Sequence, residues 1–137
     1  LQDLITAEIG DRDIEIIWNN HADKGLIIPG KLEQIIFNLL KNALEVLPDS
    51  GMIIFDMYQE GEFLVIEVSD SGPGIPSSIR NQLFDPFFTT KPNGTGLGLW
   101  VVYRLVQSMQ GIIEIESEEG QGSTFHVSVP VIRAKVA

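Results

Sequence analysis

The chain has 137 residues, 44% of them hydrophobic and 20% charged, which fits one packed globular domain and excludes two ordinary ones. Its formal net charge of −10 argues against nucleic acid as a primary partner, so an anionic ligand would be held by backbone N–H groups, a few lysines or a metal ion. The absence of cysteine excludes disulfides and thiolate metal sites, and no apolar run is long enough to span a membrane.

The first half of the chain predicts a short helix, a strand, a long helix and a hairpin. Apolar side chains in residues 1–9 have helical spacing, and residues 13–18 alternate in the manner of a strand. Over residues 31–47 the apolar positions recur at the spacing of a strongly amphipathic helix. The β-rich runs 52–58 and 63–69 flank a short polar turn, which is typical of a hairpin.

The second half predicts a short helix over residues 77–84 and a long irregular loop over residues 85–96. A second long helix is expected over residues 97–110, with Gly111 as its C-terminal stop. The runs 112–118 and 123–129 form a final hairpin. This order of elements predicts a single α/β domain, a two-layer sandwich in which helices cover one face of a mixed, mostly antiparallel sheet.

The first long helix carries two asparagines one turn apart. Asn38 and Asn42 point within about 40° of each other, beside the apolar stripe. Asparagine is at best an ordinary helix former, and amide oxygens suit a hard cation such as Mg²⁺. Two solvated surface amides are the alternative when this helix is considered alone.

Two glycine-rich segments could approach a ligand closely. In residues 70–75 (DSGPGI), a carboxylate at a strand end could accept a hydrogen bond from an exocyclic amine, while glycine leaves space for a flat ring. Residues 94–99 (GTGLGL) open the second long helix, whose N-terminal N–H groups suit phosphate oxygens. Lys91 is the most obvious cation nearby. A plain Asp/Gly turn and a merely flexible loop are the respective alternatives.

The histidines and the clustered phenylalanines receive structural interpretations. His21 and His126 are isolated from each other and from any acidic or nucleophilic cluster, and His126 is expected on the outer face of the last strand. Phe84, Phe87 and Phe88 are interpreted as hydrophobic anchors of a loop rather than as a stacking platform.

Four segments in this order resemble the boxes of a known family. Residues 38–43 (NLLKNA) match the N box, 70–75 the first glycine box, 84–91 (FDPFFTTK) the F box and 94–99 the second glycine box. With these four boxes in this order, essentially the whole chain resembles the catalytic, ATP-binding domain of a bacterial sensor histidine kinase, a member of the Bergerat-fold ATPase superfamily.

This resemblance implies roles for particular residues. Asp70 would bind the adenine amino group, Gly72 and Gly74 would shape the base pocket, and Asn42 with Asn38 would hold Mg²⁺ against the phosphates of ATP. Residues 85–96 would form the ATP lid. No catalytic residue is expected in this chain, and the implied nucleotide-binding set is Asn38, Lys41, Asn42, Asp70, Gly72, Gly74, Ile75, Thr89, Thr90, Lys91, Gly94, Thr95, Gly96, Leu97, Gly98 and Leu99.

The resemblance also implies partners. Neither histidine lies in the H box that marks the family's phosphoacceptor, so the acceptor helices are expected before Leu1 in a longer parent protein or in another chain. The γ-phosphate would pass to a histidine on that dimerisation domain and, indirectly, to a response regulator in two-component signalling. The isolated domain is expected to be monomeric and cytoplasmic, with no contact to nucleic acid or membrane.

Three other functions stay open. Autonomous ATPases of the superfamily place a water-activating Glu where this chain has Asn38, so efficient hydrolysis is not expected. A serine kinase of the anti-sigma type fits the Phe-Phe-Thr-Thr-Lys segment less well. A non-catalytic nucleotide-sensing module would keep the pocket and lack the transfer.

Overall fold

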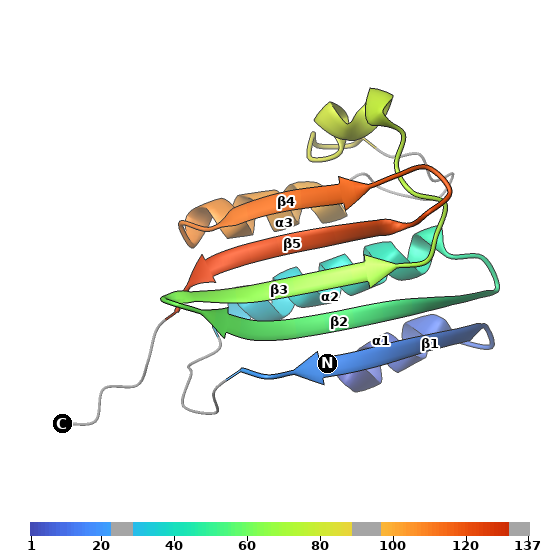
Figure 1. Ribbon diagram of the computed structural model, residues 1–137, viewed down its shortest axis with the longest axis horizontal. Coiled ribbons are helices and arrows are strands. Elements are labelled where there is room, and N and C mark those ends of the chain that lie inside the picture. Colours follow the sequence, from blue (N-terminus) through green and yellow to red (C-terminus); the bar gives the residue numbers. More distant parts are fainter. Residues whose placement is uncertain (23–28, 89–96, 132–137) are drawn as a thin grey trace.

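The structure is a computed structural model that describes residues 1–22, 29–88 and 97–131 (Figure 1). Every helix and strand expected from the sequence is present, and most bounds differ by one or two residues. Most of the loop expected over residues 85–96 lies outside the described residues. The elements in chain order are α1 (Gln2–Ile9), β1 (Asp13–Asn20), α2 (Gly30–Val46), β2 (Ser50–Glu60), β3 (Phe63–Asp70), the 3-10 helix η1 (Ser77–Gln82), α3 (Gly98–Ser108), β4 (Ile112–Ser117) and β5 (Ser123–Pro130).

The strands form one mixed sheet in the order β1-β2-β3-β5-β4. β1 runs parallel to β2, and the β2/β3, β3/β5 and β4/β5 pairs are antiparallel. In Figure 1, α1, α2 and α3 all lie behind this sheet and leave its front face without a helical layer. The two-layer α/β sandwich with helices on one face is therefore confirmed.

The core lies between α2 and the inner face of the sheet. Fully burying one aliphatic side chain stabilises the fold by roughly 1.5–3 kcal/mol, so the stripe along α2 fixes this helix firmly on the sheet. The buried residues of that stripe are Leu32, Ile35, Ile36, Leu39, Leu40, Ala43 and Leu44. Polar residues at the border of the stripe thereby receive fixed positions relative to the strand ends.

The end of α3 differs from the prediction. The helix ends at Ser108, two residues early, and Gln110 rather than Gly111 has the left-handed conformation, with φ of 58°. Gly111 is needed for a different reason: a Cβ there would lie 2.6 Å from the Ser128 carbonyl oxygen. The close approach of β5, which sequence spacing does not reveal, is what requires glycine at this position.

Several chain segments that carry polar motifs meet at one edge of the sandwich. The C-terminal ends of α2 and β3, the start of α3 and the β4–β5 turn all lie toward the right-hand edge in Figure 1. No helix among the described residues is long and apolar enough to cross a membrane.

Candidate functional site

Asp70 is a buried acid at the end of β3. The residue is 8% exposed, and its Oδ1 accepts a hydrogen bond of 2.9 Å from the Gly72 N–H. Burial raises the pKa of Asp70, and backbone hydrogen bonds from Gly72 and Ser123 oppose this rise. A carboxylate held in place by backbone donors can accept a further hydrogen bond from a ligand without reorganising.

The loop after Asp70 is held by the β4–β5 turn. The Ile75 N–H donates to Ser117 Oγ at 2.7 Å, and the Gly120 N–H donates to the Pro73 carbonyl at 2.7 Å. Gly74 has a φ of 77°, and a Cβ there would overlap the Glu118 backbone. The structure therefore gives Gly74 a packing role against this turn, in addition to the close ligand approach expected from the sequence.

An open pocket of about 440 Å³ lies between the end of α2 and this loop. Such a volume is within the range of small-molecule sites. A Cβ on Gly72 would lie 2.8 Å from Asp70 Oδ1 and 3.3 Å from Val46 Cγ2, so a side chain at this position would crowd the space beside the carboxylate. The lining residues are Val46, Leu47, Pro48, Ser71, Gly72 and Pro73.

The asparagines of α2 lie in line with that pocket. Residues four apart on a helix share a face, so Asn38, Asn42 and Val46 form a row that ends at the pocket wall. Asn38 and Asn42 are half-buried, and Lys41 is exposed. Among the residues that the structure describes, no group of three His, Cys, Asp or Glu side chains could hold a metal ion. A cation at this edge would therefore use amide and ligand oxygens.

The second glycine segment is described only in part. Leu97 is the N-cap residue of α3, Gly98 is its first residue, and Leu99 is half-buried. Figure 1 places this helix start at the same edge as the end of β3. The remaining expected ligand residues, Thr89, Thr90, Lys91, Gly94, Thr95 and Gly96, lie outside the described residues.

The interpretation of the phenylalanines is wrong for Phe87. Phe84 stacks on Tyr103 with ring centroids 5.5 Å apart and packs against the core. Phe87, in contrast, is 72% exposed and has a φ of 68°. A ring this exposed is not packed into the core, so Phe87 does not anchor the loop.

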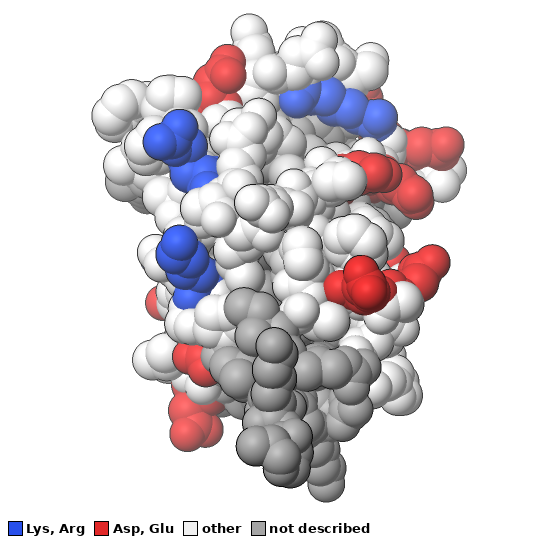
Figure 2. All heavy atoms as spheres, turned by 90° about the vertical axis from the view of Figure 1, so that its left-hand side faces the viewer, with Lys and Arg blue, Asp and Glu red and all other residues white. Residues whose placement is uncertain are grey.

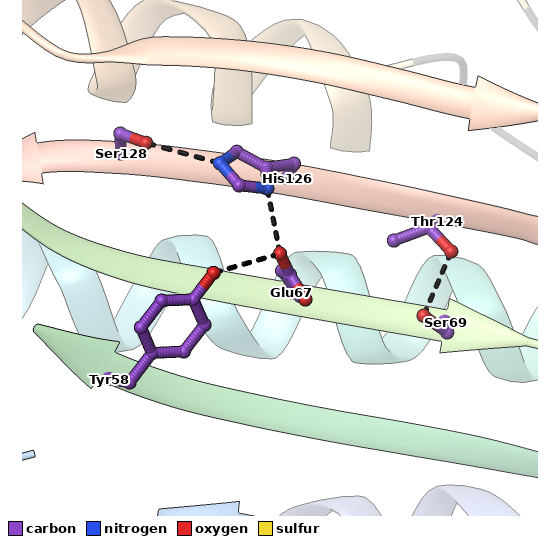
Figure 3. A network of polar contacts seen from close by, with 6 residues as sticks. All are labelled: Tyr58, Glu67, Ser69, Thr124, His126 and Ser128. Carbon is purple, nitrogen blue, oxygen red and sulfur yellow. Dashed lines mark hydrogen bonds and ion pairs between the residues drawn. The ribbon is translucent and has the colours of Figure 1, made fainter. Parts of the chain in front are cut away.

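His126 lies on the outer face of β5, as expected, but it is not isolated from acidic side chains. His126 Nδ1 lies 2.9 Å from Glu67 Oε1, which also accepts a hydrogen bond from the Tyr58 hydroxyl (Figure 3). Burial, and then the charge of Glu67, raises the pKa of Tyr58. The expectation failed because Glu67 and His126 become neighbours only through the β3/β5 register.

This outer face is unsuitable for an anionic ligand. None of the five described strands contains Lys or Arg, and Asp56, Glu67 and Glu114 lie side by side with His126 in one transverse row. In Figure 2, where this face lies to the right, acidic side chains lie along the right-hand margin, and others lie at the lower left. Repulsion from these carboxylates disfavours an anionic ligand on the open face of the sheet.

Comparison with known proteins identifies the family. The sequence model described as "Histidine kinase-, DNA gyrase B-, and HSP90-like ATPase" matches residues 28–133. The chain belongs to this family. Sporulation kinase E of Bacillus subtilis (strain 168) is 43% identical over 104 residues, which cover 75% of this chain and 14% of that protein. The sensor histidine kinase ZraS of Escherichia coli (strain K12) is 36% identical over 130 residues, covering 93% and 28%.

Solved histidine kinases share the fold. The structure of full-length ShkA in complex with AMPPNP matches 98% of this chain and 29% of its own, with a TM-score of 0.84 and 29% identity. A nucleotide-free catalytic domain of the histidine kinase ThkA matches with a TM-score of 0.74 and 28% identity over 94% of this chain and 84% of its own. The resemblance expected from the four boxes is confirmed, and the chain spans less than a third of the two curated relatives.

The boxes of this histidine kinase-like ATPase family locate α2 and the Asp70 loop, but they miss the β4–β5 turn. Ser117, Gly120 and Ser123 form hydrogen bonds with that loop and with Asp70, whereas the sequence pattern of this segment predicts only a hairpin turn. Its glycines and serines were the available signal. Their contact with residues 70–75 depends on the pairing of β3 with β5, which local patterns do not specify.

Proposed function

We propose that this chain is the catalytic domain of a sensor histidine kinase, which binds Mg-ATP and donates the γ-phosphate to a histidine on a separate dimerisation domain. The observation that carries the proposal is the buried Asp70 carboxylate beside an open pocket at the end of α2. The family of the chain and its similarity to sensor and sporulation kinases support the same function.

The base of the nucleotide would lie beside Asp70. The carboxylate would accept a hydrogen bond from the exocyclic amine of adenine, and Gly72 would leave room for the ring. Ile75, whose N–H is held by Ser117, and Gly74 would shape the adjoining backbone. A buried acceptor next to a pocket selects a base that donates at that position over one that does not.

The phosphates and Mg²⁺ would lie closer to the N-terminus of α2 than the base does. The half-buried amides of Asn42 and Asn38 have the oxygen donors that Mg²⁺ prefers, and Lys41 would approach the phosphates from the exposed side. The N-terminal N–H groups of α3, from Leu97 to Leu99, would face phosphate oxygens, together with Thr89, Thr90, Lys91, Gly94, Thr95 and Gly96. Bound Mg²⁺ supplies positive charge that offsets the charge on the transferred phosphoryl group.

The chain itself would bind and orient ATP and exclude water from it, without supplying a nucleophile. Phosphoryl transfer depends mainly on positioning and charge stabilisation, so such a domain can present the γ-phosphate to an acceptor on another domain. The relatives that this chain matches are several times longer, which leaves room for acceptor and sensor domains in a parent protein. A response regulator would take the phosphoryl group from the acceptor histidine, and the use of ATP favours a cytoplasmic location.

The transfer is tested by incubating the chain with γ-labelled ATP, Mg²⁺ and the histidine-containing dimerisation domain of its parent kinase. We expect acid-labile, alkali-stable label on the acceptor and none on the chain alone. The matched control replaces the acceptor histidine with glutamine. Label on the chain alone, or acid-stable label on serine, contradicts the proposal, and binding without transfer identifies a nucleotide-sensing module instead.

Replacing Asn42 should remove the gain in ATP affinity that Mg²⁺ provides. Without the amide oxygen, Asn42→Ala is expected to weaken ATP binding in Mg²⁺ by about tenfold or more, equivalent to about 1.4 kcal/mol, with little change in EDTA. Calorimetric titration in both buffers measures the difference. Gln34→Ala removes an exposed amide from the same helix and should leave both affinities unchanged. An equal loss with and without Mg²⁺ would assign Asn42 to packing rather than to the metal.

A further inference from the structure

Arg12, between α1 and β1, bonds the ends of two helices. Its Nη1 donates to the carbonyl of Leu44 at 2.8 Å and to that of Leu47 at 3.3 Å. Its Nη2 and Nε donate to the carbonyls of Glu8 and Ile9, each at 3.3 Å. The last carbonyls of a helix have no partner within the helix, and a cation there also interacts favourably with the helix dipole. One half-buried guanidinium therefore joins the C-terminal ends of α1 and α2.

The end of α2 that Arg12 holds is one wall of the pocket beside Asp70. Leu47, whose carbonyl accepts from Arg12, lines this pocket together with Val46. A Cβ on Gly72 would lie 3.3 Å from Val46 Cγ2, so this wall lies close to the opposite loop. A displacement of the α2 end would change the width of the pocket.

A second bond from the same N-terminal segment supports this wall. The N–H of Asp13, the first residue of β1, donates to the carbonyl of Asp49 at 2.7 Å, just after α2 ends. Arg12 and Asp13 both precede residues 28–133, which are the part of the chain that the family's sequence model matches. The support therefore comes from outside the boxes that carry the resemblance.

We propose that Arg12 is a positioning residue for the nucleotide pocket: it fixes the end of α2 against the Asp70 loop and thereby couples the placement of α1 to nucleotide affinity. This inference rests on the proposed function, because it requires the nucleotide to bind at this pocket. Arginine suits the role, since its planar fork reaches the carbonyls of both helices at once. A lysine ammonium on a flexible stem would keep the charge and lose the fixed geometry.

The test is calorimetric titration of Mg-ADP into the full chain and into Arg12→Gln and Arg12→Lys. All titrations are made at a temperature at which circular dichroism shows each variant fully folded. We expect Arg12→Gln to weaken binding by about tenfold and Arg12→Lys by less. Arg104→Gln, an exposed arginine on α3, is the matched control and should bind as the original chain does. Amide exchange should become faster in the last turn of α2 of Arg12→Gln and stay unchanged in its first turn.

The outcomes separate this inference from the proposed function. If the original chain does not bind Mg-ADP, the proposed function fails and this inference fails with it. If the original chain binds and fully folded Arg12→Gln binds equally well, only the role of Arg12 is overturned, because a purely structural arginine changes the folded fraction and not the affinity of folded molecules. Should Arg12→Gln not fold, Arg12→Lys makes the same comparison, and an affinity equal to that of the original chain contradicts the inference.

Discussion

Asp70→Asn is expected to weaken nucleotide binding strongly while leaving the unliganded domain at least as stable as the original chain. Burial raises the pKa of Asp70, so ionising this carboxyl is harder in the folded state than in the unfolded state. The contribution of Asp70 to stability is therefore complete below its unfolded pKa and is lost as pH rises through the folded pKa. Asparagine keeps one acceptor oxygen for the backbone donors Gly72 and Ser123, and it avoids the cost of ionising a buried group.

Two measurements check this prediction. Urea unfolding at a series of pH values should show that the stability of Asp70→Asn relative to the original chain increases from acid toward neutral pH. Titration with ATP should show a loss of about 1.5–3 kcal/mol, the usual size for a hydrogen bond to a charged group. Asp56→Asn, which alters a half-buried carboxylate on the outer face of the sheet, is the control and should not change the affinity. Unchanged ATP binding in Asp70→Asn would contradict the assigned role.

Gly122→Ala is expected to be far more destabilising than Gly120→Ala, although the two glycines lie two residues apart with similar φ values of 86° and 82°. A Cβ on Gly122 would overlap the Asp70 carbonyl oxygen, whereas a Cβ on Gly120 meets nothing within 4 Å. The left-handed conformation costs each alanine roughly 1–2 kcal/mol. Overpacking should add about 1–3 kcal/mol to the loss at Gly122 alone.

Urea denaturation measures the free energy of unfolding of both variants. Because both alanines bear the same backbone cost, the difference between the two values reports the close contact at Gly122 alone. Because relief of the overlap requires a shift of the β3 end, Gly122→Ala should also weaken ATP binding, while folded Gly120→Ala should bind normally. Equal destabilisation of the two variants would show that the β4–β5 turn does not pack closely against the Asp70 backbone. In that case the turn would not be part of the support for the pocket.

The sequence predicts those parts of the fold whose signal is local. The stripe along α2 is visible because its apolar residues recur every three or four positions, and the structure buries Leu32, Ile36 and Leu40 as expected. Asp70 is recognisable because it comes at the end of a β-rich run and two glycines, Gly72 and Gly74, follow it. Residues that depend on distant partners are not predictable in this way. Gly111 was assigned to a helix stop, but the backbone of β5 requires it.

The same limit applies to the site and its surroundings. His126 was expected to be isolated, and its contact with Glu67 spans 59 positions of sequence and depends on strand register. Arg12 carried no sequence signal, because its four acceptors are backbone carbonyls on two helices. No side-chain pattern marks such a role. The amphipathic pattern predicts the position of Asn42 on its helix. The pocket between the end of α2 and the Asp70 loop is evident only in three dimensions.

The most direct test of the nucleotide site is a titration of the ¹⁵N-labelled chain with Mg-ADP, followed by two-dimensional NMR. We predict the largest shift changes at the backbone amides of Asp70 and Gly72 and at the side-chain amide of Asn42. Tyr58 and His126, on the outer face of the sheet, should be unaffected. Saturable changes centred on that outer face, or no change at all, would contradict a nucleotide site at the end of α2.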